Sequence, residues 1–124
     1  MNEIDPHGKA PGDPGAKLDS GKNRLGLVLG DFARALEEVG RVGTFGAAKY
    51  SPRGWVEVPN GIDRYHDALY RHLLSYAKDD LRDKDSGLLH LSHACWNSLA
   101  LLDLTLRNRP EQPKAAEPTD WSAS

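Results

Sequence analysis

The stretch that decides the fold spans residues 88–107 and reads LLHLSHACWNSLALLDLTLR. Its apolar residues recur every three or four positions, which predicts one long helix that follows Gly87 and runs to about Arg107. We expect the main stripe of this helix to be buried and the thiol on it to be inert. This main stripe consists of Leu88, Leu91, Cys95, Leu99, Leu102 and Leu106.

The opposite side of the same helix carries His90, His93 and Asn97, and its flanks are again apolar. A helix that is apolar nearly all round is buried on several sides. Its polar side chains must then have partners, because an unpaired buried polar group costs about 1–3 kcal/mol. They face a site, a partner subunit or an internal hydrogen-bond network.

Two shorter helices are expected before this one. Residues 29–42 form the first, with Asp31 in its first turn; Gly40, Gly43 and Gly46 weaken its end, so that its continuation through residues 47–50 stays open. The second begins near Ile62 and ends before Asp79, and residues 55–58 between them form at most a short strand. Because two helices cannot surround the third, the pattern predicts an all-α bundle that is completed by oligomerisation.

Composition limits the classes of protein that the chain can be. Its 124 residues fit one domain, and 16 basic against 18 acidic residues give no excess of the kind that sequence-blind nucleic-acid binders carry. One cysteine and no long apolar run favour a cytoplasmic protein without a membrane partner. Residues 1–16 are rich in Pro and Gly, and residues 108–124 carry three prolines among charged residues. We therefore expect a flexible arm and tail around a working domain of residues 17–107, with Trp121 as the one tail residue that could dock.

Acids and imidazoles are spread over the three expected helices. Glu37 and Glu38 lie off the first apolar stripe, and His72 lies at the margin of the second, where it should be partly buried. His90 and His93 have the spacing that lets two side chains on one helical face bind one ion. The alternatives are solvated carboxylates, a buried polar network and, for the aspartates of residues 79–85, a solvated loop.

A basic group surrounds the glycine-containing loops at both ends of the first helix. Its members are Lys17, Lys22 and Arg24 before the helix and Lys49 and Arg53 after it. Ammonium groups and backbone amides there could bind phosphates, and Tyr50 or Trp55 could stack on a base. The alternative is a solvated basic rim with Trp55 covering the core.

Several ordered blocks of the sequence carry a resemblance to a known family. They are residues 16–24 (AKLDSGKNR), 38–50 (EVGRVGTFGAAKY) through Trp55, Arg64-Tyr65, Arg71-His72-Leu73 and 83–88 (DKDSGL), followed by His90 and His93. Over about residues 17–104 the chain resembles the phage dATP/dGTP diphosphohydrolases, which are MazG-like, and among them the MazZ group of phages that replace adenine by 2-aminoadenine.

This resemblance implies an all-α pyrophosphatase that uses two or more Mg²⁺ or Mn²⁺ ions held by helix carboxylates. Such an enzyme cuts a nucleoside triphosphate between its α- and β-phosphates. The implied substrate is dGTP, with dATP as a second candidate, and the dGMP formed would feed 2-aminoadenine nucleotide synthesis. The resemblance also implies a homo-oligomer, a dimer or a tetramer.

Carried over residue by residue, the resemblance implies Glu38 as catalytic residue and metal ligand, then Glu37 and Asp67, then His90 and His93. Implied substrate-binding residues are Lys17, Asp19, Lys22, Lys49, Tyr50, Trp55, Arg71 and His72. One departure is Arg41, which stands where MazG relatives carry a third glutamate. Two alternatives remain: a phosphohydrolase with His and Asp metal ligands that acts stepwise or releases triphosphate, and a non-catalytic helical assembly module.

Overall fold

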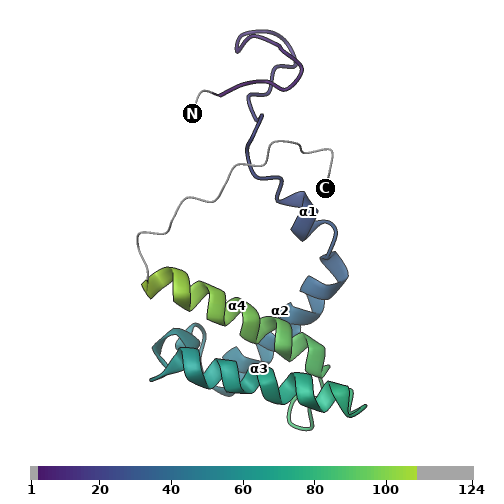
Figure 1. The fold of residues 1–124 in the computed structure, drawn as a ribbon, viewed down its shortest axis with the longest axis vertical. Helices are drawn as coiled ribbons and strands as arrows, with labels where there is room; N and C mark the ends of the chain where they lie inside the picture. The colour runs from purple at the N-terminus through teal and green to yellow at the C-terminus, as the bar shows by residue number, and fades with distance from the viewer. Residues whose placement is uncertain (1–2, 109–124) are drawn as a thin grey trace.

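The computed structural model describes residues 3–108, and these residues are helical with no strand among them (Figure 1). The elements are α1 (Gly26–Leu29), α2 (Ala33–Lys49), a 3₁₀ helix η1 (Gly54–Glu57), α3 (Gly61–Ala77) and α4 (His90–Asn108). The predicted all-α class is therefore confirmed.

The main packing unit is the antiparallel pair of α3 and α4, which lie side by side while α2 crosses them (Figure 1). Residues 78–89 connect the pair and form an isolated antiparallel bridge between Arg82 and Leu89. α4 begins at His90, later than the sequence predicts, because the preceding residues are held in a tight turn. In that turn the Asp83 amide donates to the Leu88 carbonyl at 2.8 Å, and Gly87 adopts a φ of 74°.

The first predicted helix is shifted toward the C-terminus. A four-residue α1 ends at Leu29, and Asp31 lies in the turn before α2 rather than in a first helical turn. α2 then continues through its three glycines to Lys49, which settles the question that the sequence left open. Gly43 lies against α4, since an added Cβ would make an ordinary van der Waals contact at 3.7 Å from the Trp96 indole nitrogen.

Three aromatic rings form the core at the other end of the molecule. Trp55, Tyr65 and Trp96 make mutual edge-to-face contacts, with ring centroids 5.5–6.5 Å apart. The Tyr65 hydroxyl donates to the Trp55 carbonyl at 2.9 Å. The expectation of a short strand at residues 55–58 is wrong, because Trp55 is drawn into this cluster by a 3₁₀ turn, and no strand among the described residues lies beside it.

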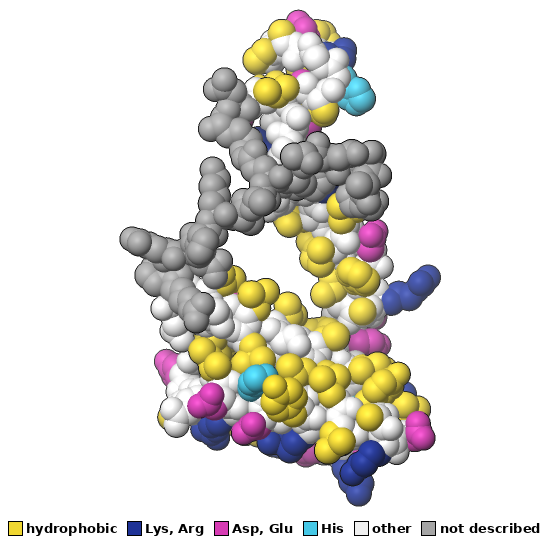
Figure 2. All heavy atoms as spheres, viewed as in Figure 1, with side chains coloured by type: hydrophobic (Ala, Val, Ile, Leu, Met, Phe, Trp, Pro, Cys, Tyr) yellow, Lys and Arg dark blue, Asp and Glu magenta, His cyan; other side chains and the backbone are white. Residues whose placement is uncertain are grey.

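The buried face of α4 is the reverse of the predicted one. The side chains that α4 buries are His90, Ser92, Ala94, Asn97, Ala100 and Leu104. The predicted stripe is largely outside: Leu99 is 50% exposed and Leu102 57%, and Cys95 is an exposed thiol, so its predicted burial is wrong. Most of the buried side chains are small or polar, whereas most leucines of α4 lie on the exposed side. Figure 2 shows the resulting hydrophobic surface over α3 and α4.

The N-terminal segment, residues 3–25, folds back on itself and lies away from the α3–α4 pair (Figure 1). The buried carboxylate of Asp5 accepts the Lys17 and His7 amides, both at 2.6 Å. The boundaries predicted for the arm, the working domain and the tail stay predictions, and Trp121 lies outside the described residues. Within residues 3–108 no helix has the length and hydropathy that crossing a membrane requires.

Two glycines should respond in opposite directions to substitution by alanine. An added Cβ at Gly46 of α2 meets nothing within 4 Å, so Gly46→Ala should raise the free energy of unfolding by about 0.5–1 kcal/mol. Gly87→Ala should lower it by about 1 kcal/mol, because φ at this position is 74°. Denaturant unfolding followed by circular dichroism measures both, and a destabilising Gly46→Ala would contradict the open space found around this position.

Candidate functional site

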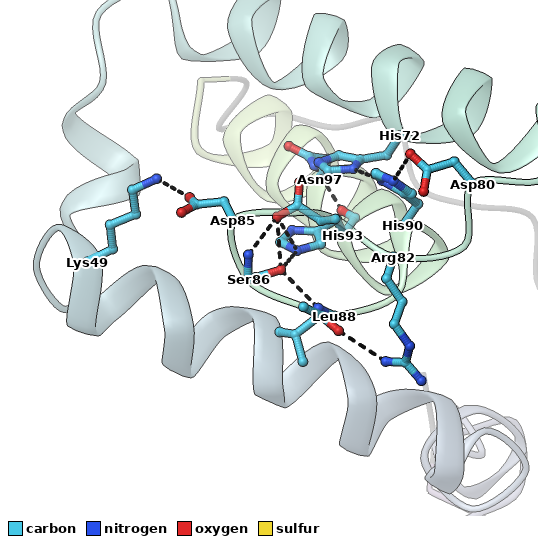
Figure 3. Close-up of polar contacts among 12 residues, drawn as sticks. Lys49, His72, Asp80, Arg82, Asp85, Ser86, Leu88, His90, His93 and Asn97 are labelled. Atoms are coloured by element: carbon cyan, nitrogen blue, oxygen red, sulfur yellow. Dashed lines mark hydrogen bonds and ion pairs between the residues drawn. The ribbon is translucent and has the colours of Figure 1, made fainter.

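Three imidazoles meet where α3 passes the beginning of α4 (Figure 3). His72 comes from α3, while His90 and His93 come from the first turn of α4. The His72 ring stacks on His93 with centroids 4.6 Å apart and planes 10° apart, and its Nδ1 lies 2.8 Å from Nδ1 of His90. Two of these three histidines are the pair whose spacing suggested a site, and the predicted part-burial of His72 is confirmed.

The hydrogen bonds of the cluster fix which ring nitrogens carry protons when the rings are neutral. His90 Nε2 lies 3.3 Å from Asp80 Oδ2, and a carboxylate oxygen can only accept, so Nε2 of His90 is the donor. The lone pair of neutral His90 is then on Nδ1. His72 must donate its own Nδ1–H to that atom, which gives a chain of hydrogen bonds from His72 through His90 to Asp80.

A second chain runs through the loop of residues 78–89. The Ser86 amide and hydroxyl both donate to Asp83 Oδ2, at 2.8 and 3.0 Å. Because the hydroxyl has a single proton, its oxygen accepts from its other neighbours, the Leu88 amide at 3.1 Å and Nε2–H of His93 at 2.7 Å. The turn thus holds Asp83 and His93 in fixed orientations beside His72.

The electrostatics of the cluster keep the imidazoles of His72 and His93 neutral and the carboxylate of Asp83 charged at pH 7. Burial, and then the charges that His93 and His90 would carry, lower the pKa of His72 from 6.5 to about 4. Burial also lowers the pKa of His93, against the opposing effect of Asp83. Burial alone would raise the pKa of Asp83, but the two hydrogen bonds from Ser86 bring it below its ordinary value.

A shallow groove adjoins this cluster on the side of α2. It has a volume of about 640 Å³ and is lined by Glu37, Gly40, Arg41, Thr44, Phe45, Ser86 and Leu88. Arg41 forms ion pairs with both predicted carboxylates, at 3.7 Å to Glu37 and 3.3 Å to Glu38. Ser86 therefore belongs to both the groove and the imidazole cluster.

The predicted metal ligands do not all converge. Among the described residues, one group of three potential ligands converges: His72, Asp83 and His90. Each offers one ligand atom, and the three atoms lie within 4.8 Å of one another. Glu37 and Glu38 pair with Arg41 on α2, and Asp67 is exposed on α3. His90 is thus the predicted ligand that lies in the convergent group, while His93 lies beside it.

Of the predicted substrate-binding residues, His72 and Lys49 come close to the cluster. Lys49, at the end of α2, forms an ion pair with Asp85 of the loop, and this partner raises the lysine pKa (Figure 3). Tyr50 is 78% exposed beside it, and Arg71 is exposed on α3.

The other predicted substrate-binding residues lie elsewhere. Trp55 is committed to the aromatic core, where Arg107 also covers its ring at 5.3 Å. Lys17, Asp19 and Lys22 lie in the N-terminal segment, and Lys22 pairs there with Glu3 at 2.9 Å. The structure thus does not bring these four residues to the imidazole cluster.

Sequence reasoning left open whether the aspartates of residues 79–85 belong to a site or to a solvated loop, and it did not select Asp80, Asp83 or Ser86 as site residues. A signal was available in residues 83–88, DKDSGL, where a glycine that favours positive φ follows a carboxylate and a hydroxyl. This pattern is typical of a turn whose side chains form hydrogen bonds within the same turn, and it directly precedes His90 and His93.

The low pKa of His72 should make the metal-free protein sensitive to acid. The unfolded chain takes up a proton at His72 near pH 6.5, whereas the folded chain does so only near pH 4. The free energy of unfolding should therefore be unaffected by His72 above pH 6.5 and should fall as the pH is lowered from 6.5 to 4. With a discount for partial solvent exposure, we expect a loss of about 1–2 kcal/mol. Denaturant unfolding in the presence of a chelator measures it from pH 7 to 4.5.

His72→Gln should flatten this dependence, while His66→Gln, a change at an exposed histidine of the same helix, should leave it in place. Equal slopes in the two variants would contradict the assignment.

Comparisons with known proteins identify the family to which the chain belongs. Residues 12–114 match the family described as "dATP/dGTP diphosphohydrolase, N-terminal". A curated relative from Salmonella phage PMBT28, called "dATP/dGTP diphosphohydrolase", is 36% identical over 110 residues, which cover 89% of this chain and 34% of the relative. The chain thus spans about a third of that relative's length, and no solved structure matches it. The chain belongs to the family of dATP/dGTP diphosphohydrolase N-terminal domains.

Proposed function

We propose that the protein hydrolyses a purine deoxynucleoside triphosphate, dGTP with dATP as a second substrate, to the monophosphate and pyrophosphate. The observation that carries this proposal is the convergence of imidazoles, with His72 kept neutral by its low pKa, and a carboxylate beside a groove, in a chain of this family. The name of the phage relative supports the substrate class. Production of dGMP for 2-aminoadenine nucleotides is the physiological role that we propose.

A divalent ion, Mg²⁺ or Mn²⁺ and in two or more copies, is the proposed cofactor. Bound to phosphate oxygens, such ions would offset charge and lower the pKa of an attacking water. The donor set of the cluster, two imidazoles and one carboxylate, fits Mn²⁺ better than Mg²⁺, which prefers oxygen ligands. Glu37 and Glu38 would have to leave Arg41 to bind an ion, and a triphosphate in the groove would offer Arg41 another anionic partner.

The chain's own residues have separate proposed tasks. Lys49, which pairs with Asp85 of the loop, and Arg41, which lines the groove together with Ser86, would neutralise charge on the leaving pyrophosphate. His93 is neutral at pH 7 and donates through Nε2, so its Nδ1 lone pair is available to take a proton. Glu38 remains the proposed carboxylate that orients water, provided that Arg41 releases it.

A second candidate is favoured by the same cluster. A phosphohydrolase that uses His and Asp ligands would release triphosphate or act stepwise, and the residues that converge are of these types rather than helix glutamates. Its activity would depend on His90 more strongly than on Glu38.

An assay with dGTP and Mn²⁺ or Mg²⁺ separates these mechanisms. The first predicts dGMP and pyrophosphate, a loss of about 10²-fold or more in kcat in Glu38→Gln, and full inhibition by a chelator. The second predicts deoxyguanosine with triphosphate, or dGDP with phosphate. Glu57→Gln, at an exposed glutamate of η1, is the control that should keep its activity. No turnover with either purine substrate would overturn the proposed function.

We also infer that a second copy of the chain covers the exposed leucines of α4. No large side chain is fully buried among the described residues, and leucines 91, 99, 102 and 106 form one exposed face of α4. Exposed apolar side chains of α3, including Leu73 and Leu74, extend the hydrophobic surface. A self-complementary apolar face of this kind is typical of homodimers.

Leu99→Glu should therefore convert a dimer or tetramer into a smaller species, because a carboxylate would be buried without a partner. Light scattering coupled to size exclusion measures the mass. Leu25→Glu, at an equally exposed leucine before α1, should leave the assembly unchanged. A wild-type chain that is monomeric at micromolar concentration would contradict the inference.

A further inference from the structure

The inference concerns the convergent group of His72, Asp83 and His90, and it deepens the proposed function without depending on turnover. We propose that these three side chains bind one divalent transition-metal ion of the Mn²⁺, Fe²⁺ or Co²⁺ type, through two imidazole nitrogens and one carboxylate oxygen. The three ligand atoms already lie within 4.8 Å of one another on α3, the connecting loop and α4.

The distances fit an ion after small side-chain movements. An ion at the centre of a triangle with 4.8 Å sides would be about 2.8 Å from each atom, against a usual bond of about 2.0–2.2 Å. The two histidine Nδ1 atoms are closer, at 2.8 Å. With metal–nitrogen bonds of about 2.1 Å this separation corresponds to an angle of about 85° at the ion, near the value for neighbouring ligands in an octahedron and well below the tetrahedral angle.

The surroundings of each ligand are those of a metal site. His90 donates Nε2–H to Asp80, which fixes its tautomer and leaves Nδ1 for the ion, as carboxylates do for metal-bound histidines. Asp83 is held at Oδ2 by Ser86, and the described residues offer no hydrogen bond to its Oδ1. His72 lies against His93, whose ring limits its rotation.

The protonation states are also suitable. Low pKa values keep His72 and Asp83 in their metal-binding forms at pH 7. The only proton between the ligands is that of His72 on Nδ1, and a change of tautomer moves it to Nε2 without a net change in charge. An ion would therefore replace one weak neutral hydrogen bond between the two imidazoles.

Three protein ligands leave room for exogenous ones. An octahedral ion held here would have three further positions for water or phosphate oxygens. Through Ser86 the site adjoins the groove of α2, so these positions would be near a nucleotide bound in that groove. This last step rests on the proposed function, whereas the metal site itself does not.

Metal binding to the nucleotide-free chain tests the proposal. Calorimetric titration of chelator-treated protein should give one Mn²⁺ per chain, bound at least 10-fold more tightly than Mg²⁺. His72→Gln and Asp83→Asn should each weaken Mn²⁺ at least 10-fold. The matched controls, His66→Gln on the same helix and Asp85→Asn in the same loop, should leave the affinity within 2-fold.

A spectroscopic measurement keeps the test independent of how well the variants fold. Electron spin echo spectroscopy of Mn²⁺ on the wild-type chain should detect two imidazole nitrogens, and His72→Gln should retain one. Absence of nitrogen coupling in the wild type, equal affinity for Mn²⁺ and Mg²⁺, or unchanged affinity in Asp83→Asn would each overturn the site. Turnover of dGTP without these signals would support the proposed function while rejecting this metal site.

Discussion

The close contact between α3 and the small, polar face of α4 is the constraint on which the rest of the structure depends. Ala94 and Ala100 are buried on this face, and imidazoles instead of aliphatic side chains lie together near the start of α4. Polar groups can fill that space because each has a partner: no buried side-chain nitrogen or oxygen among the described residues lacks a hydrogen bond. The contacts that pack α3 against α4 therefore also bring the imidazoles of the site together.

The loop of residues 78–89 completes what the two helices begin. Asp80 and Asp83 reach the imidazoles only because the chain reverses tightly, with the Leu81 carbonyl accepting the His90 amide at 2.9 Å. Gly87 provides the positive φ of that reversal, and Arg82 donates to its carbonyl at 3.0 Å. The loop is therefore part of the site, and it also determines where α4 begins.

Because the polar face of α4 is buried within the chain, the leucines on the opposite side of the helix are exposed. A helix that is apolar nearly all round can pack only one face in a bundle of this size, so the leucine face remains at the surface. The sequence argument correctly inferred that α4 has more apolar surface than the chain can cover. It assigned the covered face wrongly, because it ranked side chains by hydrophobicity and did not weigh how closely two helices can approach.

The sequence by itself determined the all-α class, the approximate positions of α3 and α4, and the shared helical face of His90 and His93, because these features follow from periodicity and local spacing. Tertiary structure decided which face of α4 is buried, that Trp55 belongs to the core, and that Asp83 rather than Glu37, Glu38 or Asp67 joins the histidines. Those outcomes depend on the distances between segments that are far apart in the chain. Such distances follow from the sizes of the side chains at the helix contacts, which no local pattern specifies.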